Sequence, residues 1–448
     1  MTDADHVAGG RAGLPSVELP HDAHPPSRTP EAAANPTRTF ASLRYLQYRH
    51  LFTVGVLMFI AVQAQQIARG QLAFELTGSN AGLGGVYLGF GVPMLLITPI
   101  GGVVADRFPK RTVLLCAQVC LVASAAWIAI AGALGVVEYW MLVGAAVLQG
   151  AGFAVLGPTR VAFTAELVPK HLLGNAVAVT QMSLNSTRVF APAVAGALIA
   201  IRSIGTTGVY VITTVVMTFS LIVAYRLPQT ARRSRDSTRS VAGELTDGMR
   251  YARRDPLLKL LILSSFVMVM TAWPYLAFLP AVANDMHDAG TSGLGLLSAV
   301  SAVAALAVTI WIAGRTRPNH AWRIQSICGV VLAIGLLGVA ASPNFALCLV
   351  ALFVIGGAAT GYQSMNNTIV LIISDLEYHG RVQSLLMLSF AGFGLAALPL
   401  GLLADAVGLR TTFAAMGSVC LVTMACYALA QRRLRRHGGN RDLETAPG

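Results

Sequence analysis

The chain has 448 residues, of which 55% are hydrophobic and only 12% are charged, so it has too few charges to cover the two or three soluble domains that its length would otherwise suggest. The net charge of +12 does not indicate nucleic-acid binding. The basic residues fall in alternate loops and in the tails, which is the distribution that membrane orientation requires.

Residues 1–42 contain six prolines among polar residues, and no apolar stretch follows the initiator methionine. This composition predicts a disordered tail and not a signal peptide. The scattered histidines of the tail do not indicate a metal site. The six cysteines do not either, because all lie inside apolar segments and lack metal-site spacing.

Twelve apolar segments follow, each long enough to cross a bilayer as a helix. In chain order they span 51–76, 82–105, 112–135, 139–160, 174–200, 207–227, 258–283, 293–313, 322–341, 345–372, 384–404 and 411–430. The sequence therefore predicts an all-α polytopic membrane protein with twelve transmembrane helices.

The longest polar interruption divides these segments into six and six. It spans residues 228–256 and contains seven arginines. We predict an N-terminal six-helix half at 43–227, a basic linker at 228–256, a C-terminal half at 257–430 and a basic tail at 431–448. The short loops on the other face hold only Arg202 and Arg410, so both tails and the linker are predicted to be cytoplasmic.

A polar turn between the second and third segments reads Gly102-Val-Val-Ala-Asp106-Arg107-Phe-Pro-Lys110-Arg111. One acid and three bases cannot lie in hydrocarbon, so this turn joins two helices at one membrane face. The turn resembles the signature loop of the major facilitator superfamily. That resemblance implies two halves that alternate between inward- and outward-open states, with these five numbered residues forming part of a conformational gate.

Two further charged residues complete the predicted gate. Glu166 follows the fourth segment, where it can pair with the bases of the turn, and Arg381 lies on the same face in the second half. Ion pairs that form in one state only bias the equilibrium between states. The alternative is that these charges set membrane topology alone.

Shorter strings resemble the branch of that superfamily that contains enterobactin-type siderophore exporters and macrolide-efflux proteins. They are Glu75-Leu-Thr-Gly-Ser79, Gly157-Pro158-Thr-Arg160, Glu166-Leu-Val-Pro169, Asn175-Ala-Val-Ala178, Asn367-Thr368 and Gly380-Arg381-Val382. The resemblance implies a monomer in the bacterial cytoplasmic membrane that needs no cofactor. The resemblance also implies export of small amphiphilic molecules such as drugs, antibiotics or siderophores by proton antiport.

Two positions depart from that pattern. An arginine of the fourth helix in drug antiporters is replaced by Ala146, and the acidic residue of the first helix by Val62. No acid lies at the centre of any predicted helix. The proton-coupling candidates are therefore Glu75 and Asp405, which fall near the outer face and also fit a plain interfacial role.

Two helices carry a polar stripe that includes an arginine. In the first, Gln65, Gln66 and Arg69 share one face; in the fifth, the stripe contains Gln181, Asn185 and Arg188. An arginine inside the membrane costs about 2.5–3.5 kcal/mol on insertion scales unless it meets water or a partner. These six residues are substrate-binding candidates. The alternative for Arg69 is that it bonds to carbonyl groups or extends toward the outer membrane surface, and the alternative for the stripe of the fifth helix is that it joins neighbouring helices.

Four amides of the fourth and tenth helices are also candidates for a cavity between the halves, since mid-membrane amides need partners. They are Gln149, Gln363, Asn366 and Asn367.

Two other functions stay open. The arginines and the missing central acids favour an organic-anion uptake or exchange carrier without proton coupling. A non-transporting membrane sensor would need a folded domain outside the membrane, and the tails suggest none. The chain has no phosphate-binding loop or catalytic constellation, so we predict that it is not an enzyme.

Overall fold

The computed structural model describes residues 40–169, 172–229, 249–315, 320–374 and 379–437. These residues are helical almost throughout and include no strand. A short helix, η1 (Ala41–Arg44), comes first. The first group of long helices is α2 (Leu46–Thr77), α3 (Asn80–Arg107), α4 (Lys110–Ala133), α5 (Tyr139–Leu167), α6 (Leu173–Ala200) and α7 (Gly205–Tyr225). After them come α9 (Pro256–Ala272), the short α10 (Tyr275–Ala281) and η3 (Val282–Met286), and then α11 (Gly290–Arg315), α12 (Ala321–Ala341), α13 (Phe345–Ile373), α14 (His379–Val407) and α15 (Leu409–His437).

These helices match the twelve predicted segments in order, with α9, α10 and η3 together forming the seventh. Ten described segments are long and apolar enough to cross a membrane, and shorter apolar stretches lie in α6 and α14. Large apolar side chains such as Leu96, Val215 and Ile310 are each 64% exposed. Such a surface fits contact with lipid and confirms an all-α polytopic membrane protein.

The helix ends follow local sequence. The Ser79 side chain accepts the N–H of Gly82 at the start of α3, and Asp255 accepts two N–H groups of α9, whose first residue is Pro256. Gly78 ends α2 with a φ of 58°, a left-handed conformation that glycine adopts without steric cost. Gly78 and Ser79 together allow the short connection between α2 and α3.

The seventh segment is interrupted between α9 and α10, where Trp273 and Pro274 form a turn. Proline has no N–H to donate to the preceding turn, and its ring crowds that turn. The break brings Trp273 and Tyr275 to the wall of the cavity described below.

Some predicted boundaries differ from the structure. Ser42 is buried and its N–H donates to Asn175 Oδ1 at 3.1 Å, so ordered structure begins before residue 43. At the other end, α15 continues to His437. The predicted apolar segment ended at residue 430 because hydropathy falls there. The helix itself continues, since arginine and leucine favour helix in water as well as in hydrocarbon. The predicted tail from 1 to 39, and residues 230–248 of the linker, lie outside the described residues.

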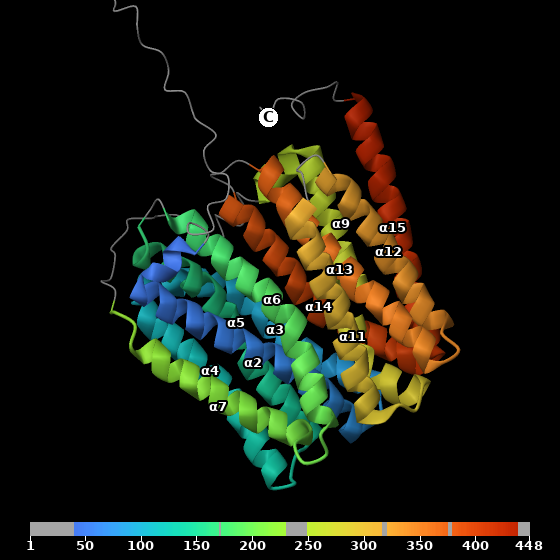
Figure 1. Cartoon of the computed structure of the whole chain (residues 1–448), viewed down its shortest axis with the longest axis horizontal. Coiled ribbons are helices and arrows are strands. Elements are labelled where there is room, and N and C mark those ends of the chain that lie inside the picture. Colours follow the sequence, from blue (N-terminus) through green and yellow to red (C-terminus); the bar gives the residue numbers. More distant parts are fainter. Residues whose placement is uncertain (1–39, 170–171, 230–248, 316–319, 375–378, 438–448) are drawn as a thin grey trace, which may run out of the picture. The chain divides into compact units, whose positions relative to one another are not determined.

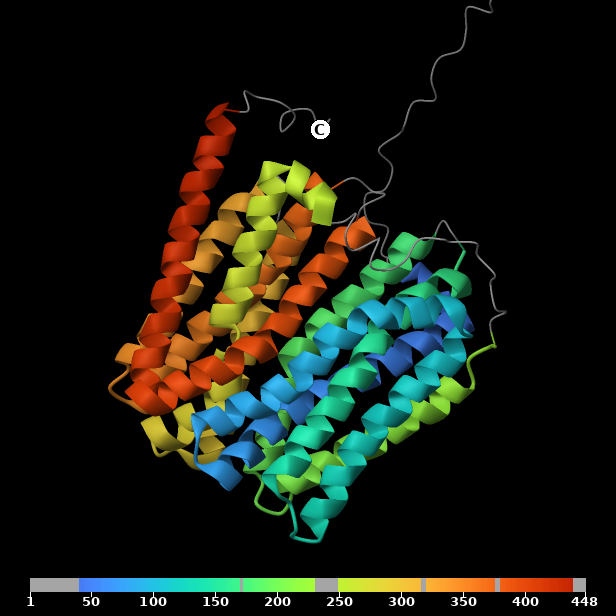
Figure 2. The same ribbon diagram turned by 180° about the vertical axis from the view of Figure 1, so that it is seen from behind.

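Figures 1 and 2 show the helices in two groups, α2–α7 in blue to green and α9–α15 in yellow to red. We call the end of the bundle where α2 meets α3 the outer end, following the orientation predicted from the charges, and the opposite end the inner end. The ribbons of the two groups diverge toward the inner end (Figure 2).

Glycines allow the two groups to touch at the outer end. A Cβ added to Gly196 of α6 would lie 2.9 Å from Gly295 Cα of α11. A Cβ at Gly84 of α3 would lie 2.4 Å from the carbonyl oxygen of Ala397 in α14. Backbones this close leave no room for side chains, so these helix pairs close the outer end by direct contact.

Candidate substrate cavity

A cavity of about 220 Å³ lies between the two helix groups, on the inner side of these contacts. Six aromatic side chains line it: Phe59, Phe90, Phe153, Trp273, Tyr275 and Phe393. The Phe153 ring lies 5.9 Å from Phe59 and 6.0 Å from Phe90, measured between centroids. Aromatic walls offer large apolar contacts to a ligand with little loss of side-chain entropy.

The polar part of the described lining is neutral. It consists of three glutamines, three serines and a threonine, namely Gln63, Gln66, Gln363, Ser298, Ser301, Ser364 and Thr360. No acidic or basic side chain belongs to the described wall. Amides and hydroxyls orient a ligand by hydrogen bonds, so this wall suits a molecule with a large apolar body and a few polar groups.

Two of the predicted binding residues lie at this cavity. Gln66 lines it from α2, and Gln363 lines it from α13. The Nε2 atom of Gln363 donates to Asn367 Oδ1 at 3.3 Å, one turn further along the helix. Asn367 is half-buried and is not among the lining residues, but its bond to Gln363 holds that amide in place.

Gln65 and Gln149 lie elsewhere. Both are buried within the first helix group, where Gln149 Nε2 donates to Gln65 Oε1 at 2.6 Å. Gln65 Nε2 in turn donates to Thr213 Oγ1 at 3.1 Å. This chain of bonds joins α2, α5 and α7, so the structure gives these two residues the helix-joining arrangement rather than a place on the cavity wall.

Asn366 forms the equivalent network in the second group. Its Oδ1 accepts from Ser265 Oγ at 2.7 Å and from Gln325 Nε2 at 2.9 Å. Gln325 Oε1 accepts from the Tyr427 hydroxyl at 2.8 Å. The network joins α9, α12, α13 and α15, and Asn366 is 1% exposed, so it too is separate from the cavity wall.

Arg69 is buried just behind the wall. It is 2% exposed, and its Cζ lies 5.6 Å from the centroid of Phe90. Its Nε and Nη2 atoms have no hydrogen-bond partner among the described residues. Gln65 and Gln149 bond to neighbouring helices, whereas these two nitrogens of Arg69 bond to none in the described part of the chain.

The polar stripe of the fifth helix lies on α6, but the side chains of Gln181, Asn185 and Arg188 fall outside the described residues. Pro192, which continues this stripe by one turn, lines the cavity. Their binding role therefore remains a prediction.

At the inner end, Lys110 Nζ lies 3.3 Å from Glu166 Oε1, with the two side chains 7% and 19% exposed. This ion pair joins the signature turn to the end of α5. Arg111 donates to the carbonyl oxygen of Tyr225 and stacks on its ring at 4.7 Å, and Arg107 is exposed. The surroundings of Gly102 and the side chains of Asp106 and Arg381 lie outside what the structure describes.

At the outer end, the carboxylate of Asp405 bridges the two helix groups. It accepts from Ser79 Oγ at 2.6 Å, from the backbone N–H groups of Asn80 and Ala81 at 2.8 and 2.9 Å, and from Asn80 Nδ2 at 3.0 Å. The acid at the end of α14 thus caps the start of α3. Glu75 lies in the last turn of α2, a few residues before Ser79. It is exposed and accepts a hydrogen bond from Gln71 Nε2 at 2.8 Å.

The sequence at Asp405 repeats part of the signature turn. Gly102-Val-Val-Ala-Asp106 ends α3 at the inner end, and Gly401-Leu-Leu-Ala-Asp405 ends α14 at the outer end. Gly401 is needed for the contact, because a Cβ there would lie 2.3 Å from the carbonyl oxygen of Asn80. The chain therefore carries a Gly-x-x-Ala-Asp string at each end of the bundle.

Sequence reasoning missed several lining residues, including Phe59, Phe90 and Phe153. A signal was present in α2, where Phe59, Gln63 and Gln66 follow helical spacings of four and three. Phenylalanines within apolar helices carry no comparable signal, because those that face lipid look the same in sequence. Tyr362 precedes the lining residue Gln363 in sequence but is fully buried and does not belong to the wall.

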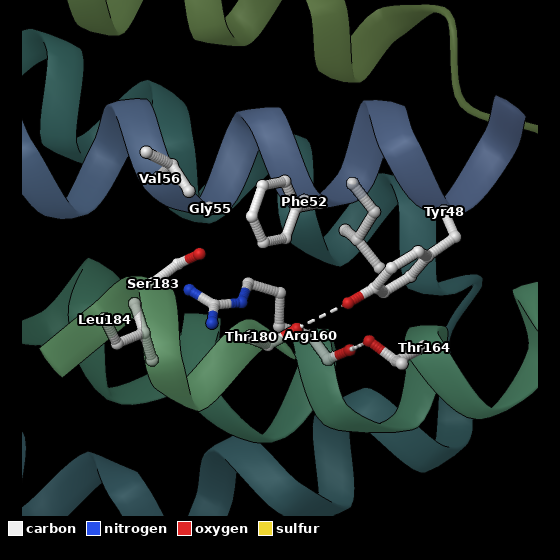
Figure 3. Close-up of a pocket in the computed structure, with 10 residues that line it drawn as sticks. Tyr48, Phe52, Gly55, Val56, Arg160, Thr164, Thr180, Ser183 and Leu184 are labelled. Carbon is white, nitrogen blue, oxygen red and sulfur yellow. Dashed lines mark hydrogen bonds between the residues drawn. The ribbon is translucent and has the colours of Figure 1, made fainter. Parts of the chain in front are cut away.

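A second, much smaller pocket of about 10 Å³ surrounds Arg160, the last residue of the Gly157-Pro158-Thr-Arg160 string. Figure 3 shows its guanidinium between α2 and α6, close to Gly55 and Ser183. A Cβ at Gly55 would lie 3.0 Å from Arg160 Nη1. The Tyr48 hydroxyl, at the edge of the pocket, donates to Ala176 O at 2.7 Å. Arg160 fills this space, which leaves room for little more than a water molecule.

Three relatives align with most of this chain at low sequence identity. The staphyloferrin A transporter of Staphylococcus aureus is 22% identical over 395 residues, covering 86% of this chain and 96% of the relative. Macrolide efflux protein A of Streptococcus pyogenes is 22% identical over 349 residues, covering 76% and 84%. The uncharacterized MFS-type transporter YfiS of Bacillus subtilis is 25% identical over 366 residues, covering 79% and 84%.

Solved structures show the same fold at low identity. A bacterial homolog of the human lysosomal transporter Spinster matches with a TM-score of 0.66 and 16% identity, over 89% of this chain and 98% of that one. The nucleoside transporter NupG matches with a TM-score of 0.66 and 12% identity, over 86% and 99%. The family model described as transmembrane secretion effector covers residues 37–445. The chain therefore belongs to this family of major facilitator superfamily transporters.

Proposed function

We propose that this protein exports small amphiphilic molecules, such as antibiotics or siderophore-type metabolites, across the bacterial cytoplasmic membrane by alternating access. The observation that carries the proposal is the cavity between the two helix groups, with aromatic walls and neutral polar groups. The names of two relatives, a macrolide efflux protein and a staphyloferrin A transporter, support this substrate class.

Alternating access is supported by the closed outer end. The Gly196–Gly295 and Gly84–Ala397 contacts separate the cavity from that end. For export, these contacts must part while the inner end closes, with the Lys110–Glu166 pair and the signature turn acting as the inner gate.

Proton antiport is the coupling that we propose, with Asp405 as the candidate group. Its carboxylate holds the outer end closed through four hydrogen bonds. Protonation would remove its negative charge and one acceptor position, and would therefore weaken the closure. Asp405 is exposed at the outer end, where a proton from that side can reach it. Glu75 is the second candidate.

The test uses the full-length protein in lipid vesicles, with a radiolabelled macrolide and staphyloferrin A as separate substrates. Transport of either against its gradient should depend on an imposed pH gradient and stop when nigericin collapses that gradient. Trp273→Ala should reduce transport several-fold because Trp273 lines the cavity. Trp311→Ala is the matched control, since Trp311 is 46% exposed on the surface of α11.

Failure of both substrates to cross, or equal loss in the two tryptophan variants, would count against export through this cavity. An organic-anion carrier is the second candidate, favoured by buried Arg69 and by the absence of acids from the described cavity wall. In that case transport would persist after collapse of the pH gradient and would rise with an anion on the opposite side.

A further inference from the structure

Arg69 is the feature of the interior that the neutral cavity does not explain. The side chain is 2% exposed, and its Nε and Nη2 atoms are buried without a hydrogen-bond partner among the described residues. Buried polar groups in proteins are almost always bonded, and buried charges are paired. The guanidinium of Arg69 therefore lacks an acceptor for two of its buried nitrogens.

The neighbours of Arg69 do not supply an acid. The Phe90 ring lies under the guanidinium at 5.6 Å, which offers a cation–π contact but no hydrogen-bond acceptor. Tyr87 and Tyr210 are near enough to interact electrostatically with it. The Tyr87 hydroxyl donates its proton to the carbonyl oxygen of Gln66 at 3.1 Å. None of these described neighbours carries a negative charge at neutral pH.

Arg69 lies directly behind two residues of the cavity wall. Gln66 precedes it by three residues, so it lies on the same face of α2, and it lines the cavity. Phe90 lines the cavity as well and contacts Arg69. An acidic group on a ligand held among the aromatic rings would need to pass only the Gln66–Phe90 part of the wall to reach the unused donors.

We propose that Arg69 is an anion subsite of the cavity, and that the substrates are amphiphiles carrying a carboxylate. The guanidinium offers two parallel N–H groups that match a carboxylate, and Gln66 orients the same group from the wall. This inference rests on the proposed function and narrows its substrate class. The apolar body of the ligand contacts the aromatic wall, and its acid completes the bonding of Arg69.

Equilibrium binding tests the subsite without relying on transport. The probes are 1-pyrenebutyrate and 1-pyrenebutanol, which share the pyrene body and differ in the acid. Each is titrated into the purified full-length protein in detergent, and binding is followed by energy transfer from tryptophan, because Trp273 lines the cavity. Wild-type protein should bind the acid about tenfold or more tightly than the alcohol, as expected for a charge-assisted bond.

Arg69→Met should reduce this preference to within about twofold and leave the alcohol's affinity unchanged. Arg202→Met, at an exposed outer loop, is the matched control and should keep the full preference. Because Nε and Nη2 of Arg69 are without a hydrogen-bond partner among the described residues, Arg69→Met should not lower the unfolding temperature of the ligand-free protein. A structural role would lower that temperature instead.

A measurement on wild-type protein covers the case in which Arg69→Met does not fold. Sodium formate, at constant ionic strength, should compete with 1-pyrenebutyrate and leave 1-pyrenebutanol binding unchanged. An unchanged acid preference in Arg69→Met, no preference in wild type, or no competition by formate would overturn the subsite. Failure of the vesicle experiment with intact acid preference would overturn export alone.

Discussion

Neighbouring glutamines of α2 show how one residue's direction decides its role. Gln66 lines the cavity, whereas Gln65 is buried and bonds to Gln149 and Thr213. Successive side chains of a helix point about 100° apart, so two adjacent polar residues face different neighbours. The Gln65 amide joins three helices, and the Gln66 amide lines the cavity, where we propose that it contacts the ligand.

We predict that Gln149→Leu destabilises the protein without weakening ligand binding. The change leaves Gln65 Oε1 buried without its donor, which costs about 1–3 kcal/mol. The unfolding midpoint in micelles should fall while affinity for 1-pyrenebutanol stays constant. Gln363→Leu, at the cavity wall, should do the reverse, so a loss of affinity in Gln149→Leu would contradict the assignment.

The sequence was sufficient for the helices and for some of the site. Twelve segments, their order and the Lys110–Glu166 pairing followed from apolar length and charge position, because hydrocarbon excludes charge over each span. Which polar residues face the cavity did not follow. That depends on helix rotation and on packing between distant segments, so Gln65, Gln149 and Asn366 looked the same in sequence as Gln66 and Gln363.

At the scale of elements, the ends of α3 and α14 form the outer closure. Asp405 of α14 caps the first turn of α3, and Gly401 brings the two backbones together. Charge-assisted bonds to helix N–H groups are stronger than neutral ones. This closure combines tight backbone contact with a carboxylate that a proton can neutralise.

We predict that Asp405→Asn opens the outer end more often. The reporter is Ala277→Cys on α10, which is fully buried near Gly70, in a protein whose six native cysteines are replaced. A membrane-impermeant maleimide added outside should label it about tenfold faster in Asp405→Asn, because the charged acceptor is lost. Asp288→Asn removes an exposed outer acid and serves as the control; equal labelling in both variants would rule out a closing role for Asp405.

At the scale of the molecule, two groups of helices share one cavity and touch at the outer end. The internal networks of Gln149 and Asn366 each tie several helices of one group together. Such groups are expected to move as units, so that opening at one end is accompanied by closing at the other.

Distances between spin labels test this expectation. One pair, Leu134→Cys with Pro343→Cys, reports on exposed outer loops, and the other, Phe108→Cys with His320→Cys, reports on the inner end. Adding Asp405→Asn should lengthen the outer distance and shorten the inner one. Lengthening of the outer distance alone would show local opening without rocking of the two groups.

The Gly-x-x-Ala-Asp string at both ends of the bundle has a consequence for how natural variation acts. A carrier cycles quickly only when its two conformers have similar free energies, and 1.4 kcal/mol changes their ratio tenfold. If each string strengthens a different conformer, that ratio reflects the difference between two similar caps. Single substitutions at positions 102–106 and at positions 401–405 would then change the free-energy difference between the conformers in opposite directions. A substitution that weakens the cap at one end would be compensated by one that weakens the cap at the other end.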